Sequence, residues 1–125
     1  MAKYWIKEPG LRRPFGDYVS FLWGDQDCDT DGDAKSPEDR DWTELTVINR
    51  RSDLERVDVD PLPDNPLTLL IKSDDEHLAA RLAYILAATA GGTLSDSLGG
   101  HALRRDALIP NFGDFDLAAA LERLG

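Results

Sequence analysis

One segment, residues 67–92, decides most of what this chain can fold into, because it reads as a strand that leads into a helix with both ends marked. Its first six residues are almost all apolar or β-branched, which is typical of a well-buried strand. Ser73 and Glu76 then have the spacing of a capping box, in which the serine oxygen accepts a helical N–H and the glutamate reaches back to the serine N–H. Gly91 and Gly92 end the helix, since glycine accepts the left-handed conformation that a C-terminal cap needs.

The predicted helix is amphipathic and has a face suited to packing on a sheet. Its apolar stripe recurs at helical spacing and is flanked by alanines that permit close approach: Leu78, Ala79, Leu82, Ala83, Ile85, Leu86 and Ala87. Three further strands are expected before it, at 15–23, 42–49 and 55–60, and the first two are expected to pair as a hairpin with a long loop. A short strand over 93–97 and a second helix over 114–124 complete the pattern.

Strands followed by a capped helix predict a single α+β domain over residues 1–125. We expect an antiparallel β-meander with the capped amphipathic helix packed on one face, and a C-terminal helix. A chain of 125 residues is long enough for one core and too short for two ordinary domains. It begins without the apolar stretch of a signal peptide, and its one cysteine requires no oxidising compartment, so a cytoplasmic location is expected.

The connection over residues 24–41 is an acidic hairpin loop that carries much of the charge. It holds eight acidic residues against Lys35 and Arg40, and so supplies −6 of the formal net charge of −10. Such a charge repels nucleic acid and anionic lipid and attracts basic surfaces, so we expect a basic protein partner, no nucleic acid and no membrane. Because like charges repel, the loop alone should be extended and mobile.

The same loop also spells the pattern of a calcium-binding loop. With Asp27 as the first ligand, the oxygen-bearing positions are Asp27, Asp29, Asp31, Asp33 and Glu38, and Gly32 stands where such loops turn sharply. Against calcium, Ala34 takes the place of a larger apolar residue, Pro37 stands where an exit helix should have begun, and both flanks read as strands. Three interpretations stay open: a solvated acidic loop, a docking surface for a basic partner, and a calcium site, with no other cofactor expected.

The sequence contains no recognisable catalytic set. His77 reads as an exposed residue of the first helical turn, and His101 follows two glycines without a partner motif. Cys28 lies among carboxylates that oppose thiolate formation, which makes it a poor nucleophile. A nucleophile elbow, a phosphate-binding loop and a dinucleotide fingerprint are all missing from the sequence. We therefore expect a protein that is not an enzyme.

Residues 67–96 resemble a pattern of small bacterial immunity proteins, which neutralise toxins delivered between neighbouring cells. In both, a strand leads into an alanine-rich helix that ends in Gly-Gly, followed by a short hydrophobic segment and an aspartate, here Asp96. The resemblance covers a minor part of the chain. It implies a small, often acidic protein that performs no catalysis and binds a cognate toxin domain tightly.

The leading hypothesis is therefore an immunity or inhibitor protein of interbacterial competition that docks its acidic loop on a basic toxin surface. Complementary charge would set the association rate and the choice of partner, and tryptophans at the base of the loop would supply affinity. The expected partner-binding residues are Trp23, Asp25, Asp27, Asp29, Asp31, Asp33, Glu38, Asp39, Asp41 and Trp42. The alternative hypothesis is a calcium-binding or calcium-stabilised interaction module.

Overall fold

The computed structural model describes residues 1–24, 28–50, 52–97 and 99–124, with the backbone alone described for residues 52–54. The elements along the chain are β1 (Ala2–Lys7), α1 (Phe15–Trp23), β2 (Cys28–Gly32), β3 (Leu45–Asn49), β4 (Ser52–Leu62), β5 (Asn65–Ser73), α2 (Glu76–Ala90), β6 (Thr93–Ser95), the 3₁₀ helix η1 (Arg105–Asn111) and α3 (Leu117–Leu124). The longest helix, α2, has 15 residues, and within the described ranges no helix combines the length and hydropathy of a membrane span.

Six strands form one sheet in the order β2-β3-β4-β5-β1-β6, and every pair of neighbours is antiparallel. Strands β2 to β5 form a meander that follows the chain. Strand β1 joins it at the far side, between β5 and β6, so that the two ends of the sheet are β2 and β6. The predicted α+β fold, with an antiparallel meander, a packed helix and a C-terminal helix, is confirmed.

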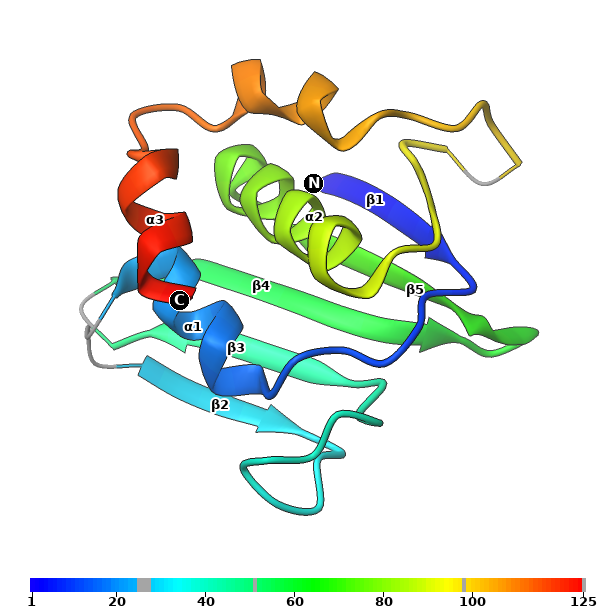
Figure 1. Ribbon diagram of the computed structural model, residues 1–125, viewed down its shortest axis with the longest axis horizontal. Coiled ribbons are helices and arrows are strands. Elements are labelled where there is room, and N and C mark those ends of the chain that lie inside the picture. Colours follow the sequence, from blue (N-terminus) through cyan, green and yellow to red (C-terminus); the bar gives the residue numbers. More distant parts are fainter. Residues whose placement is uncertain (25–27, 51, 98, 125) are drawn as a thin grey trace.

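The helices cover only one face of the sheet (Figure 1). Helix α2 crosses strands β1, β4, β5 and β6, while η1 packs on α2, and α1 packs against α2 and α3. The strands bury alternate residues on this face, such as Ile6, Val47, Val59 and Ile71, each of which is 0% exposed. The core therefore lies between the sheet and the helices, and in the described part of the chain the opposite face of the sheet carries no helix.

Residues 15–23 form helix α1, and the prediction of a strand there is wrong. Tyr18, Phe21 and Leu22 are all buried, and their spacing of three and four residues defines one face of a helix. The Tyr18 hydroxyl lies 2.8 Å from Thr89 Oγ1, which ties α1 to the end of α2. The expected hairpin of 15–23 with 42–49 therefore does not exist, and β3 pairs with β2 and β4 instead.

The start of α2 also differs from the prediction. Asp75, not Ser73, is the N-cap, and its carboxylate accepts hydrogen bonds from the backbone N–H groups of His77 and Leu78. Ser73 is still part of β5, where its hydroxyl donates to the carbonyl of Arg56 and accepts from the N–H of Asp75. A carboxylate at the cap also faces the positive end of the helix dipole, which explains why it replaces the serine. The predicted end at Gly91 is confirmed, with φ 74°.

Loss of the Asp75 cap gives the first test. Asp75→Ala should lower the free energy of unfolding by about 1 kcal/mol, because two backbone N–H groups lose their acceptor. Asp74→Ala removes the same charge from the neighbouring exposed position and should change stability by less than about 0.5 kcal/mol. Urea unfolding followed by circular dichroism measures both. Equal losses in the two variants would show that the charge, and not the cap, matters.

Candidate functional site

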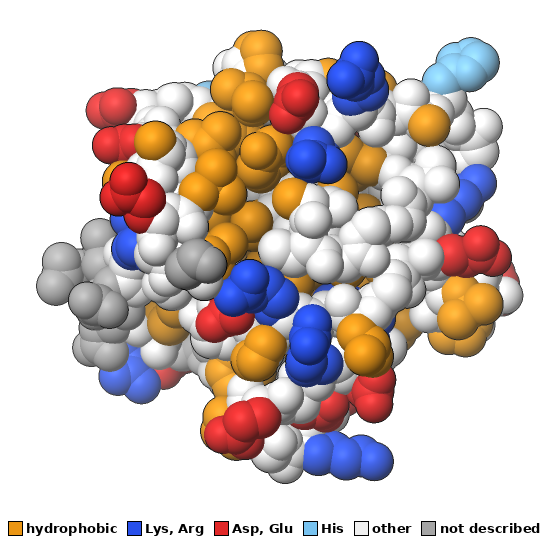
Figure 2. All heavy atoms as spheres, viewed as in Figure 1, with side chains coloured by type: hydrophobic (Ala, Val, Ile, Leu, Met, Phe, Trp, Pro, Cys, Tyr) orange, Lys and Arg blue, Asp and Glu red, His pale blue; other side chains and the backbone are white. Residues whose placement is uncertain are grey.

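Most of the predicted site residues lie at one end of the sheet, in a unit that we call the acidic edge and define as residues 28–44. It consists of the edge strand β2 and the connection from β2 to β3, which extends beyond the sheet at the bottom of Figure 1. Its carboxylates are Asp29, Asp31, Asp33, Glu38, Asp39, Asp41 and Glu44, against Lys35 and Arg40. Figure 2 shows acidic side chains around this connection. Asp25 and Asp27, which were also predicted to bind the partner, lie outside the described residues.

Two of these aspartates hold the connection in a folded shape. The Asp33 carboxylate accepts hydrogen bonds from the N–H of Thr43 at 2.8 Å, the Thr43 hydroxyl at 2.7 Å and the N–H of Glu44 at 2.9 Å. The Asp39 carboxylate accepts from the N–H groups of Lys35, at 3.0 Å, and Asp41, at 2.8 Å. The acidic edge is thus crossed by hydrogen bonds, in contrast to the extended loop that like-charge repulsion predicted.

The hydrogen bonds also lower the pKa values of both carboxyl groups. Partial burial by itself would raise the pKa of Asp33, but the hydrogen bonds from Glu44 and Thr43 outweigh it and hold the pKa below the usual 3.8. The N–H groups of Lys35 and Asp41 lower the pKa of Asp39 in the same way. Both aspartates are therefore charged at neutral pH while serving as internal acceptors.

The base of the acidic edge is anchored to the segment that precedes α1. Trp42 is 1% exposed, and its indole N–H donates to the carbonyl of Arg13 at 2.9 Å. The guanidinium of Arg12 donates to the carbonyl of Trp42 at 2.8 Å, and that of Arg40 donates to the carbonyl of Arg12 at 2.9 Å. The ring of Tyr18 meets Trp42 edge-on with 5.7 Å between centroids. The segment before α1 and the base of the acidic edge therefore hold each other in place.

The same burial corrects the expectation that the two tryptophans are surface anchors for a partner. Trp42 lies in the core, and Trp23, which is 9% exposed, lies in α1 with its ring also in the core. A partner that docks on this conformation does not meet either ring as an exposed anchor. The sequence pattern correctly placed Trp42 at the base of the loop, but its role is to hold that base to the protein.

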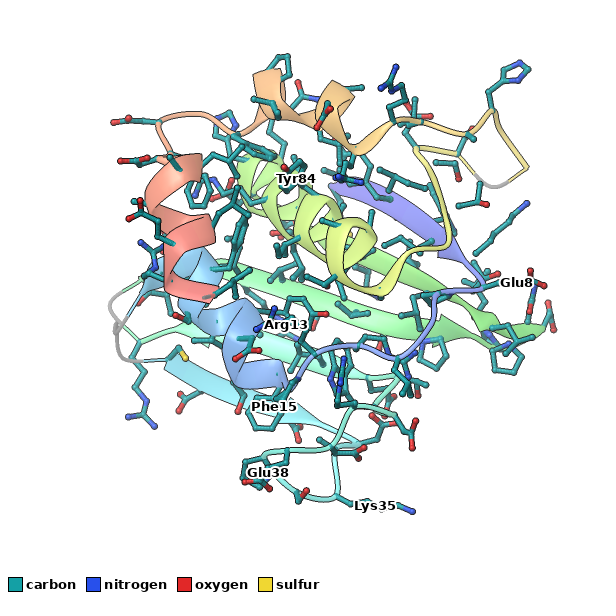
Figure 3. All side chains as sticks on the ribbon, viewed as in Figure 1. Glu8, Arg13, Phe15, Lys35, Glu38 and Tyr84 are labelled. Atoms are coloured by element: carbon teal, nitrogen blue, oxygen red, sulfur yellow. The ribbon has the colours of Figure 1, made fainter. Side chains whose placement is uncertain are left out.

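Four carboxylates of the acidic edge are directed to solvent and form no ion pair with the residues that the structure describes: Asp31, Glu38, Asp41 and Glu44. The only hydrogen bond described for their side chains joins Asp31 to the N–H of Gly32, next to it in the chain. Asp29 differs, because it pairs with Arg50 at 2.7 Å. Figure 3 shows Glu38 and Lys35 at the outer end of the connection, and Phe15 nearer the sheet. The four side chains form a negative surface that these described residues do not neutralise.

Two hollows flank the acidic edge. One, of about 210 Å³, is lined by Phe15, Thr30, Asp31, Gly32, Ala34, Trp42, Glu44 and Leu45. The other, of about 130 Å³, is lined by Asp31, Gly32, Glu44, Leu45, Thr46 and Asp60. Four residues are common to both, so the hollows lie on either side of the same β2–β3 pairing. In the first, the partly exposed Phe15 provides aromatic lining beside the acidic residues, which suits the long side chain of a lysine or an arginine.

The described calcium-motif residues do not converge on one point. Asp29 and Asp31 lie on an extended strand, where Asp29 pairs with Arg50, and Asp33 is occupied by Thr43 and Glu44. Asp27, the first position of the motif, lies outside the described ranges. Within those ranges, no group of three or more histidine, cysteine, aspartate or glutamate side chains is arranged to hold a metal ion. The flank before the motif is also a helix, α1, and not the strand that the sequence predicted.

The two histidines lie apart from the acidic edge. His77 is exposed at the start of α2, and its Nδ1 is 2.7 Å from the carbonyl oxygen of Asn111. His101 is exposed in the segment that precedes η1. In the described part of the chain, neither ring is hydrogen-bonded to an acidic or nucleophilic side chain, so the geometry gives neither one a catalytic partner.

Sequence reasoning missed the residues that fasten the acidic edge. Arg12 is only 8% exposed, and its guanidinium binds main-chain carbonyls of Trp42 and Gly10. Thr43 supplies two of the three donors to Asp33. Neither residue belongs to a recognisable motif, since their roles come from segments that meet only in the folded chain. Comparison with models of protein families, with curated proteins and with solved structures found no match to this chain.

Removal of the Asp33 carboxylate tests whether the hydrogen bonds within the acidic edge stabilise the protein. Asp33→Ala should lower the free energy of unfolding by about 1 to 2 kcal/mol, because three donors lose an exposed but charged acceptor. Asp41→Ala is the matched control, since it removes an exposed carboxylate of the same connection for which no side-chain hydrogen bond is described. Chemical denaturation measures both variants. Similar losses would contradict the role given to Asp33.

The pH dependence of stability gives a second test of these hydrogen bonds. Because Asp33 and Asp39 have pKa values below the usual aspartate value, their stabilisation is present above about pH 4 and is lost as the pH falls through the lowered values. Titration of the side-chain carboxyl carbons by nuclear magnetic resonance should give midpoints below 3.8 for both residues. Midpoints at or above the usual value would show that the hydrogen bonds do not form in solution.

Proposed function

We propose that this chain is an immunity or inhibitor protein, and that its acidic edge docks on a basic surface of the toxin domain that it neutralises. The observation that carries the proposal is the set of four outward carboxylates, Asp31, Glu38, Asp41 and Glu44, on a connection that internal hydrogen bonds keep folded. Many toxins that act on nucleic acids or nucleotides have basic substrate channels. A protein that fills such a channel would block the substrate.

The arrangement favours rapid and selective association. Uncompensated negative charge attracts a basic surface over several ångströms and raises the association rate, while it repels acidic surfaces. A connection that is already folded loses little conformational freedom on binding, because Asp33 and Asp39 have ordered it beforehand. Docking would thus use the outer carboxylates of the acidic edge, and the inner ones would maintain its shape.

The identification as an immunity protein rests on the resemblance of residues 67–96 and on the concentration of charge. In the structure, the resembling segment comprises most of β5, all of α2 and β6, and therefore forms part of the scaffold. The acidic edge lies at the opposite end of the sheet from β6. The scaffold and the docking surface are thus separate parts, and we place the protein in the cytoplasm, where it would meet an incoming toxin.

Co-expression is the direct test of the proposed function. The chain should restore growth of cells that express the toxin domain encoded by the adjacent reading frame. Glu38→Lys, Asp41→Lys and Glu44→Lys in one variant should abolish or greatly reduce this protection, because the surface changes sign. Protection that is absent with the wild-type chain would contradict the proposal.

The rate of association shows which surface of the chain meets the toxin domain. At low salt, the triple variant should associate with the purified toxin domain at least tenfold more slowly than the wild type, because electrostatic attraction is replaced by repulsion. A control variant with Asp106→Lys, Asp114→Lys and Glu122→Lys carries the same charge change on exposed positions of η1, α3 and the segment between them. Equal slowing in the control would show that net charge, and not the acidic edge, governs the encounter.

A further inference from the structure

The face of the sheet without helices is a second surface, which shares strand β2, with Asp29 and Asp31, with the acidic edge. Because side chains alternate along a strand and directly paired residues share a face, the pairing of the strands identifies its members. From β1, β4 and β5, the residues on this face include Lys3, Trp5, Lys7, Arg56, Asp58, Asp60, Leu70 and Lys72. From β2 and β3, they are Asp29, Asp31, Thr46 and Ile48. Their alternate neighbours on the inner strands of the sheet form the core on the covered face.

One row of this face crosses five strands and changes sign along its length. Lys3 on β1 is paired with Lys72 on β5, and Lys72 with Asp58 on β4. Asp58 is paired with Thr46 on β3, and Thr46 with Asp31 on β2. The row therefore reads basic, basic, acidic, polar and acidic from one side of the sheet to the other.

The same separation of charge extends over the whole face. Among residues whose side chains the structure describes, strands β2, β3 and β4 present four aspartates and Arg56. Among the same residues, strands β5 and β1 present Lys72, Lys3 and Lys7 and no acidic residue. Trp5, Leu70 and Ile48 lie between these charges, are only partly exposed and are not part of the core. Three of the aspartates form ion pairs within the chain, with Arg50, Arg56 and Lys72. Among the described residues, the charges of this face without such a pair are Asp31 on the acidic half and Lys3 and Lys7 on the basic half, with apolar groups between them.

We propose that this face binds a second copy of the chain, face to face, about a two-fold axis that runs parallel to the strands between β4 and β5. Such an axis lays β4 on β5 of the second copy and β3 on β1 of the second copy. Within one chain Lys72 pairs with Asp60 at 3.7 Å and Asp58 with Arg56 at 3.2 Å, so the contact across the axis depends chiefly on Lys3. Lys3 lies over Thr46 of the second copy, with Asp31 and Asp58 on either side. Each such contact occurs twice, because the interface is symmetric. A two-fold axis perpendicular to the strands would instead place acidic strands on acidic strands.

The size of the face sets the expected strength of the dimer. Six strands about 4.8 Å apart, with about six residues of about 3.3 Å each, give a face of roughly 24 by 20 Å. Two copies would bury on the order of 1,000 Å², which is the lower limit for a specific interface. Interfaces of this size are typical of weak and transient complexes. The net charge of −10 on each copy opposes association, which agrees with a weak and reversible dimer.

Reversing one charge on each half of the face tests the dimer, and mixing the two variants distinguishes loss of pairing from misfolding. Lys3 and Asp31 are both exposed, so Lys3→Glu and Asp31→Lys should leave the fold intact. In sedimentation equilibrium at physiological salt, each variant alone should dimerise at least tenfold more weakly than the wild type, because like charges then meet twice. An equimolar mixture should recover the dimer, because the glutamate introduced in one chain meets the lysine introduced in the other, and the second contact keeps its native pair.

Two control variants make the same changes of charge at positions away from this face. Lys35→Glu and Glu38→Lys lie at the outer end of the acidic connection and should leave the dissociation constant within about twofold of the wild type (Figure 3). A wild-type chain that stays monomeric at about 500 μM, a concentration at which a weak dimer is populated, would overturn the proposal. So would a mixture that dimerises no better than either variant alone. Lys3→Glu should still protect against the toxin, so failure of the dimer and failure of the proposed function are distinguishable.

Discussion

The structure depends on the burial of a single face of its sheet. Helix α2 covers strands β1, β4, β5 and β6, and the buried apolar residues of β1, β4 and β5 alternate with residues that face away from the helices. Since the layer of helices lies on one side only, the charged residues of the strands are collected on the other. The same constraint leaves β2 at the end of the sheet, where aspartates remain solvated.

The acidic edge shows how such a strand can carry so much charge. Aspartates are unfavourable in strands, yet at the end of a sheet they also discourage pairing with other chains. Asp33 and Asp39 use their charge inside the connection, as acceptors for backbone N–H groups, and Trp42 fixes its base to the segment before α1. The outer carboxylates therefore project from a folded support, which distinguishes this connection from a solvated acidic loop that has no shape of its own.

The sequence predicted those strands and helices whose apolar residues follow one period only, above all β5, α2 and α3. Residues 15–23 fit two periods, because Val19, Phe21 and Trp23 alternate while Tyr18, Phe21 and Leu22 follow helical spacing, and contacts with α2 decide between them. Strand β2 is rich in aspartate and forms only because β3 pairs with it. The charge of the candidate site was evident from sequence, whereas its internal hydrogen bonds join residues such as Asp33 and Thr43 that meet only after folding.

Its own hydrogen bonds give the acidic edge a fixed shape before any partner binds. Amide hydrogen exchange of the free protein at neutral pH tests it most directly, because the N–H groups of Thr43 and Glu44 are donors to Asp33. We predict that both amides exchange much more slowly than in an unfolded chain, and that Asp33→Ala removes this protection while the amides of α2 keep theirs. Exchange of Thr43 and Glu44 at the unfolded rate in the wild-type protein would show that the acidic edge is not ordered in the free protein.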